Sequence, residues 1–285
     1  MFYKNIFTLQ KSLFIYTFET LILYMIKFYE LIQIALINWE IITLFLLIAI
    51  LYSSVGFGGG SSYLAVLALS SLAFTHIRAI ALLCNIVVVS GGTYIYIKNK
   101  LFNWKKIIPL VLMSVPMAFI GGYLKISQIF FFVLLAITLL IAAILMWTSK
   151  YISKKSENSG FKKSITKDIS YGGSIGFISG MIGVGGGIFL APLLHLTKWD
   201  TPKRIVATSS FFILANSIAG LAGQFLNPEF SIEPTITLLL MVTVLIGGQI
   251  GSRLSIKFIS PINIKKGTAL LITFVGIRIL WKYLM

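Results

Sequence analysis

The stretch SGMIGVGGGIFLAPLL, residues 179–194, places four closely spaced glycines, after Gly180, inside a run that is otherwise largely apolar. They are Gly183, Gly185, Gly186 and Gly187. Glycine weakens a helix and gives the backbone access to positive φ angles. Within a membrane, non-helical backbone is tolerated only where it is buried in protein or lines a water-filled cavity. The stretch therefore predicts a tight turn between two short helices inside a helical membrane protein.

The composition supports a membrane protein. Hydrophobic residues make up 58% of the chain and charged residues 11%, whereas soluble domains carry about 25% charged residues. Lysines and arginines in short loops, which orient membrane proteins, account for the net charge of +16, so we expect no nucleic-acid partner. No cluster of cysteine and histidine has the spacing of metal ligands. We therefore expect no metal, no other cofactor and no enzyme active site.

The chain repeats itself. The stretch SSVGFGGGSSYLAVLAL at 53–69 matches GMIGVGGGIFLAPLLHL at 180–196, with the glycines 127 residues apart. The motif FIGGYL at 119–124 matches LIGGQI at 245–250, 126 residues apart. These matches predict a duplication, and we divide the chain into an extra N-terminal helix, a first repeat, a cytoplasmic linker and a second repeat, at 1–39, 40–148, 149–168 and 169–285.

Each repeat is expected to hold a pair of short helices around the glycine turn, followed by three helices that cross the membrane. A crossing helix needs roughly 20 residues, so the short pair suits a hairpin that enters and returns. The expected helices are 41–55, 61–73, 79–97, 106–124 and 128–148 in the first repeat, and 171–182, 188–197, 204–223, 235–252 and 264–282 in the second.

The positions of the basic residues predict the orientation. Of the 24 lysines and arginines, 17 fall in the segments 98–106, 149–168, 198–204 and 253–266, which we place in the cytoplasm. The loop 224–234 has none and is placed outside, as are the segments that hold Arg78 and Lys125. The equivalent loops 98–106 and 224–234 then lie on opposite sides, so the repeats are predicted to be inverted. Inverted repeats with broken helices are a recurring design of transporters.

The two glycine turns suggest an anion site. A helix N-terminus presents backbone amides and a partial positive charge, and a short helix begins just after each turn. Two such ends facing each other would bind a small anion without an arginine. The candidate binding residues are Gly58, Gly59, Gly60, Ser61, Ser62, Asn85, Gly185, Gly186, Gly187, Thr208, Ser209 and Asn216.

Several alternatives stay open. Close helix packing, the explanation we give for the spaced pairs Gly172/Gly176 and Gly247/Gly251, could also explain the glycine turns. His76 and His195 are interpreted as interfacial histidines, with a proton relay as the alternative. The segment 12–37 could cross the membrane with a polar stripe of Glu19, Lys27, Glu30 and Gln33 against the bundle, or lie at the interface.

The doubled GxGGG motif, with GVGGGIFLAPLL, RIVATSSFFILANS and IGGQIGSRL in the second repeat, resembles the sulfite exporter TauE/SafE family of bacterial membrane proteins. The resemblance covers about residues 40–285 and implies transport of sulfite and organosulfonates across the bacterial inner membrane. It carries over to Pro192, Ala207, Thr208, Ser209 and the four glycines of the second turn. The first repeat departs from it, since Ala65 stands where the proline would be.

The sequence thus predicts an all-α polytopic membrane protein that transports a small anion across the lipid bilayer. An inside-negative potential drives anions outward without a coupling ion, and no acidic residue lies deep in the spans of the repeats, so we expect export. An anion channel and a membrane assembly or enzyme component are the alternatives. The anion itself, the coupling ion and the oligomeric state stay open.

Overall fold

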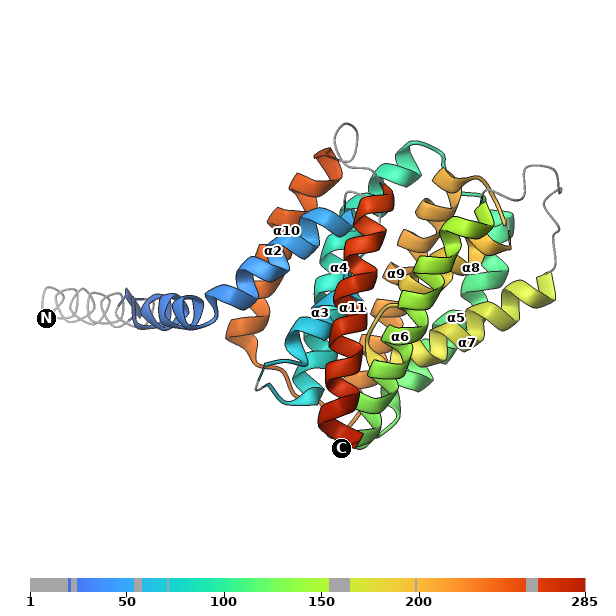
Figure 1. The fold of residues 1–285 in the computed structure, drawn as a ribbon. Coiled ribbons are helices and arrows are strands. Elements are labelled where there is room, and N and C mark those ends of the chain that lie inside the picture. The colour runs from blue at the N-terminus through green and yellow to red at the C-terminus, as the bar shows by residue number, and fades with distance from the viewer. Residues whose placement is uncertain are drawn as a thin grey trace, which may run out of the picture.

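The computed structural model describes residues 20–21, 25–53, 58–70, 72–153, 165–197, 199–254 and 261–284, and within these ranges the chain is helical and has no strand. The helices lie side by side in one bundle (Figure 1), which confirms the all-α fold. They are α2 (Trp39–Ser53), α3 (Gly60–Leu67), α4 (Phe74–Lys98), α5 (Trp104–Tyr123), α6 (Gln128–Ser153), α7 (Ile165–Ile182), α8 (Gly187–Leu196), α9 (Pro202–Phe225), α10 (Pro234–Leu254) and α11 (Pro261–Leu284).

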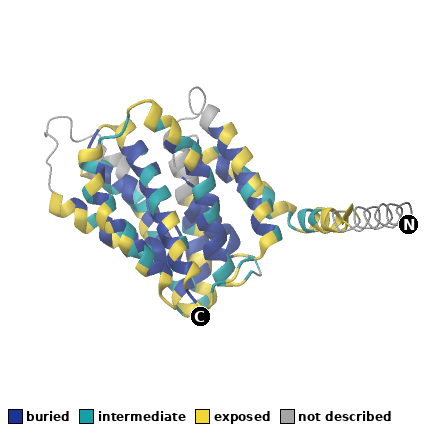
Figure 2. Cartoon of the chain, turned by 180° about the vertical axis from the view of Figure 1, so that it is seen from behind, coloured by how far each residue is buried: buried dark blue, intermediate teal, exposed yellow. Residues whose placement is uncertain are grey.

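Five helices in the described part of the chain are long and apolar enough to cross a membrane. They are α4, α5, and the greater part of α6, α9 and α10, and they match five of the six expected spans. The sixth expected span, 264–282, lies in α11. Exposed residues lie on the outer faces of the helices, and buried residues lie on the faces that helices turn toward one another (Figure 2). Many of the exposed side chains are large and apolar, so the surface of the bundle suits lipid.

The helix contacts are symmetric under exchange of the two predicted repeats. Helix α5 packs against α7 and α9, and its equivalent α10 packs against α2 and α4. Helix α6 likewise contacts α8, as its equivalent α11 contacts α3. The pairs α4–α9 and α6–α11 join a helix to its own equivalent. Such a pattern supports the predicted duplication, while the inversion of the repeats stays a prediction.

Glycines on α7 and α10 let backbones approach closely. A methyl group added to a glycine of α7 would overlap a backbone carbonyl of α5, in the pairs Gly172–Leu110, Gly176–Ser114 and Gly180–Ala118. On α10, a methyl group at Gly247 would lie 2.9 Å from the Leu46 carbonyl oxygen of α2, and one at Gly251 would overlap the carbonyl of Ile50. The structure thus confirms close packing as the role of Gly172/Gly176 and Gly247/Gly251.

Some predicted helix ends were wrong. Helix α6 continues to Ser153 rather than ending at 148, and α7 begins at Ile165 rather than at 171; residues 154–164 lie outside the described ranges. Asp168 in the first turn of α7 favours the early start, since an acidic side chain is stabilising at a helix N-terminus. Helix α3 ends at Leu67 rather than at 73, and the hydroxyl of Ser70 bonds the Leu67 carbonyl oxygen at 2.6 Å just after it.

The described segment Met25–Ile37 projects from the bundle (Figure 1) and makes an angle of 77° with α2. Lys27, Glu30 and Gln33 are exposed, so this part of the predicted polar stripe does not pack against the bundle. Glu19, the remaining member of the stripe, lies outside the described residues.

A polar cluster joins the starts of α5 and α7 to the connection between α8 and α9. The Nζ atom of Lys106 lies 2.8 Å from Asp200 Oδ2 and donates to the Trp199 carbonyl oxygen at 2.7 Å. The indole of Trp199 donates to Asp168 at 3.0 Å. Burial alone would raise the pKa of Asp200, but hydrogen bonds from Lys106 and the Thr201 amide, and the charges of Lys106 and Arg204, hold this pKa below its usual value.

We predict that Gly176→Ala lowers the free energy of unfolding by about 1–3 kcal/mol, the usual cost of overpacking. The added methyl group would overlap the Ser114 carbonyl and push α5 away from α7. The matched control is Gly92→Ala on α4, where the nearest atom would lie at an ordinary 3.7 Å. Chemical unfolding of the purified variants checks this, and equal stability of the two variants would contradict it.

We predict that Asp200→Asn destabilises the protein at pH 7, by about 1.5–3 kcal/mol, because it removes a charged hydrogen-bond acceptor. A carboxyl whose folded pKa is lowered stabilises the fold above its unfolded pKa of about 3.9 and loses this contribution as the pH falls through the folded value. The difference from the wild type should therefore shrink in acid.

The control for this prediction is Glu229→Gln. Glu229 pairs with Lys125 at 3.8 Å with both side chains more than half exposed, and such surface pairs contribute little. Unfolding curves at several pH values measure both variants. A loss of stability in Asp200→Asn that persists unchanged in acid would show that packing, and not charge, sets the effect.

Candidate functional site

The two glycine turns have the backbone geometry that the sequence predicts. Gly59, with φ of 90°, precedes α3, and Gly186, with φ of 82°, precedes α8. Gly183 and Gly185 also have positive φ, and among the described residues no other glycine does. Other residues are strained in this region, so glycine is required at these positions. Gly56 lies outside the described residues.

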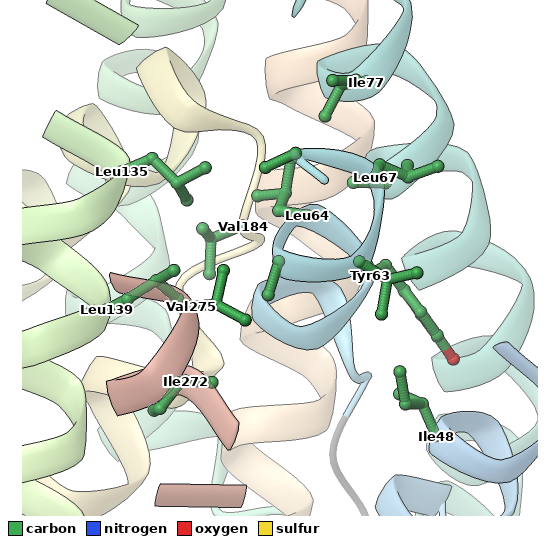
Figure 3. Packing of buried hydrophobic residues seen from close by; sticks show 14 of the residues in the cluster. Ile48, Tyr63, Leu64, Leu67, Ile77, Leu135, Leu139, Val184, Ile272 and Val275 are labelled. Atoms are coloured by element: carbon green, nitrogen blue, oxygen red, sulfur yellow. The ribbon is translucent and has the colours of Figure 1, made fainter. Parts of the chain in front are cut away.

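The two turns meet inside the bundle. A methyl group added to Gly60 would lie 2.5 Å from the carbonyl oxygen of Val184 and would overlap the side-chain amide of Asn85. Figure 3 shows Val184, on the connection into α8, beside Leu64 of α3. Asn85 of α4 donates from Nδ2 to the Val184 carbonyl oxygen at 2.9 Å. This side chain therefore joins the second turn to the start of α3.

Both turns line one pocket of about 530 Å³, counting the part that opens to the surroundings. The first residues of α3 and of α8 contribute to it, and neither helix has a side-chain cap. The partial positive charge of both helix starts is therefore directed at one space. The lining residues are Tyr52, Gly58, Gly59, Gly60, Ser61, Asn85, Val184, Gly187, Ile188, Ala191, Pro192, His195 and Ile213.

No aspartate, glutamate, lysine or arginine is among these lining residues. The polar groups at the pocket are backbone amides, the Tyr52 and Ser61 hydroxyls, the His195 imidazole and the buried Asn85 side chain, whose Oδ1 atom has no hydrogen-bond partner. Amides at a helix start favour a negative ligand. The free Asn85 oxygen adds an acceptor, which suits an anion that still carries a proton.

Half of the predicted binding residues line this pocket: Gly58, Gly59, Gly60, Ser61, Asn85 and Gly187. The others lie elsewhere. Ser62 is bonded to the Tyr52 hydroxyl at 2.6 Å, and Asn216 accepts a hydrogen bond from Ser114 of α5 at 2.5 Å. Gly185 and Gly186 shape the second turn, and Thr208 and Ser209 are buried on α9.

Sequence reasoning missed Tyr52 and His195 as lining residues. His195 was interpreted as an interfacial histidine, yet it lies on the pocket face of α8 with Ile188, Ala191 and Pro192. These residues are spaced three, four and seven apart, which places them on one side of a helix. That spacing, counted from the glycine turn, could have identified His195.

Comparison with known proteins gives the same assignment as the sequence motifs. The sequence pattern that defines the sulfite exporter TauE/SafE family matches residues 41–279. The probable membrane transporter protein y4hK of Sinorhizobium fredii is 29% identical over 83% of this chain and 96% of its own. A probable membrane transporter protein of Methanocaldococcus jannaschii is 30% identical over 59% of this chain and 65% of its own.

The probable membrane transporter protein YunE of Bacillus subtilis is 25% identical over 60% of this chain and 69% of its own. No solved structure matches the chain. The family match covers both glycine turns and the helices that hold them. This multi-pass membrane protein therefore belongs to the sulfite exporter TauE/SafE family.

Proposed function

We propose that the protein is a secondary transporter or facilitator that exports small sulfur-containing anions, such as sulfite and organosulfonates, across the cytoplasmic membrane. The observation that carries the proposal is that two uncapped helix starts, one from each repeat, line the same pocket. The solute class comes from the family. In this proposal the repeats are inverted, the 149–168 linker is cytoplasmic, and the pocket opens to each side in turn.

The charges around the pocket support export. The membrane potential contributes about 2.3 kcal/mol per charge per 100 mV, and an inside-negative potential drives an anion outward. Uptake would need a coupling ion, and the described lining residues include no carboxylate that could bind a proton or sodium. His195 is the lining side chain whose ordinary pKa lies nearest neutral pH, so any proton coupling would involve it first.

A channel for the same anions differs in one respect, the absence of alternating access. The short helices that start inside the bundle favour the transporter, because broken helices near the midplane recur in transporters with inverted repeats. A membrane enzyme or assembly component would instead place reactive groups at the pocket. Among the described residues no group of three histidine, cysteine, aspartate or glutamate side chains could hold a metal ion.

We predict that sulfite leaves protein-containing liposomes faster when the inside is made negative with a potassium gradient and valinomycin. A singly charged anion at 100 mV should reach a concentration ratio of about 50-fold. A sulfite-reactive dye outside the liposomes measures the efflux, with protein-free liposomes as the control. Efflux that ignores the potential would contradict uncoupled export, and failure of counterflow with radiolabelled sulfite would identify a channel.

We predict that Asn85→Ala weakens sulfite binding about tenfold, the effect of one lost hydrogen bond, because the Val184 carbonyl is released and the second turn loses its position. Binding is measured as the rise in melting temperature with sulfite concentration. Asn216→Ala is the matched control, since Asn216 is equally buried but bonds Ser114. It should lower the melting temperature and keep the sulfite response. An equal loss in both variants would extend the site to α9, as the sequence predicted.

A further inference from the structure

Arg78 lies where the sequence did not predict it. It was assigned to an outer loop, but it is the fifth residue of α4 and is 4% exposed. Its Nη2 atom reaches the carbonyl oxygens of Gly122 and Gly180 at 3.4 and 3.5 Å, near the upper limit for a hydrogen bond. Its Nε atom has no partner. The guanidinium is thus buried with its donors only weakly used.

No described carboxylate neutralises this charge. The ion pairs between described residues are Lys106–Asp200, Lys125–Glu229 and Arg204–Asp200. A buried charge without a partner is strongly unfavourable, and ionisable residues kept inside membrane proteins usually serve function. Arg78 therefore has unused capacity to bind a negative group.

The side chain lines a second pocket, of about 280 Å³, separate from the glycine pocket. Gln224 from the end of α9 lines the same pocket, is 4% exposed, and has an Nε2 atom without a partner. Two residues that each hold a buried donor without a partner, Arg78 and Gln224, thus line one pocket. Glu229 also lines it, but its side chain is 53% exposed and lies 3.8 Å from Lys125, so solvent and Lys125 offset its charge.

The second repeat shows how such an arginine is neutralised. Arg204 stands 126 residues after Arg78, the spacing that also relates FIGGYL to LIGGQI. Arg204 is 45% exposed and lies 3.8 Å from Asp200, four residues before it. The residue four before Arg78 is Phe74, which cannot pair with a cation. The first repeat therefore has the arginine without the carboxylate.

We propose that Arg78 and Gln224 form a second anion-binding site, distinct from the glycine pocket, that binds a small oxyanion such as sulfite or a sulfonate group. The planar guanidinium presents donors that match two oxygens of such a group. The identification of sulfur oxyanions rests on the proposed function, whereas an anion site at Arg78 does not.

The site is connected to the glycine pocket through the second turn. A methyl group added to Gly183 would lie 2.9 Å from the Arg78 carbonyl oxygen, so the backbone of Arg78 supports the turn that leads into α8. The site also borders the α9–α10 loop through Asn227 and Phe230. Since this loop is predicted to lie outside, the site holds the anion on the outer side of the glycine pocket.

Isothermal titration of the purified protein with sulfite, at constant ionic strength, tests the proposal. We expect about two equivalents bound by the wild type, and one in Arg78→Gln. Gln224→Leu should weaken that same equivalent at least tenfold without removing a charge. Arg204→Gln, the matched control, should keep both equivalents. Unchanged binding in both Arg78→Gln and Gln224→Leu would overturn the proposal, as would an equal loss in Arg204→Gln.

Arg78→Lys covers the case in which Arg78→Gln does not fold. It keeps the charge but not the fork of donors, so binding should weaken without being abolished, and wild-type binding would count against the site. Asn85→Ala separates this proposal from the proposed function. If that variant loses one equivalent and keeps the Arg78-dependent one, the glycine pocket and the second site are both supported. If the Arg78-dependent equivalent is the only one in the wild type, the second site stands and the glycine pocket fails.

Discussion

The fold depends on the requirement that backbone groups inside an apolar bundle find partners or face a polar space. Helices α3 and α8 begin within the bundle, so the amides of their first turns are buried there. The two turns that precede them meet, and the amide of Asn85 satisfies the Val184 carbonyl between them at 2.9 Å. The remaining amides of both helix starts border the pocket. One hydrogen bond thus ties the second turn to the Asn85 side chain, which also lies against Gly60 at the start of α3.

Glycine serves two different purposes in this chain. On α7 and α10 it removes side chains so that two helix backbones can touch, as at Gly176 and Gly251. At Gly59 and Gly186 it supplies a left-handed backbone that other residues adopt only with strain. Close packing sets how α7 and α10 lie against their neighbours, and the left-handed turns place the starts of α3 and α8 inside the bundle. A single residue type therefore determines both the scaffold and the site.

Patterns within short segments of the sequence predicted the features that such segments determine by themselves. The apolar runs became helices, and the glycine turns have positive φ. The glycine pairs of α7 and α10 pack against neighbouring backbones. What the sequence did not indicate depends on contacts between distant segments. Arg78 is buried because α5 and α7 cover it, and Asn216 bonds Ser114 because α5 lies against α9. Neither partner can be read from the residues nearby. His195 is an intermediate case. The sequence analysis did not place it at the pocket, although its helical spacing from the second turn could have done so.

The two turns have unequal neighbours. Gly60 faces the amide of Asn85, whereas Gly187 faces the aliphatic side chain of Ile213. In a protein built from two identical halves, the conformation that opens to one side and the one that opens to the other would have the same internal energy. Here one half has a polar neighbour at the turn where the other has an apolar one. Under the proposed alternating access, the exchange of roles between the halves would therefore favour one conformation, and the protein would have a resting state even without a solute or a membrane potential.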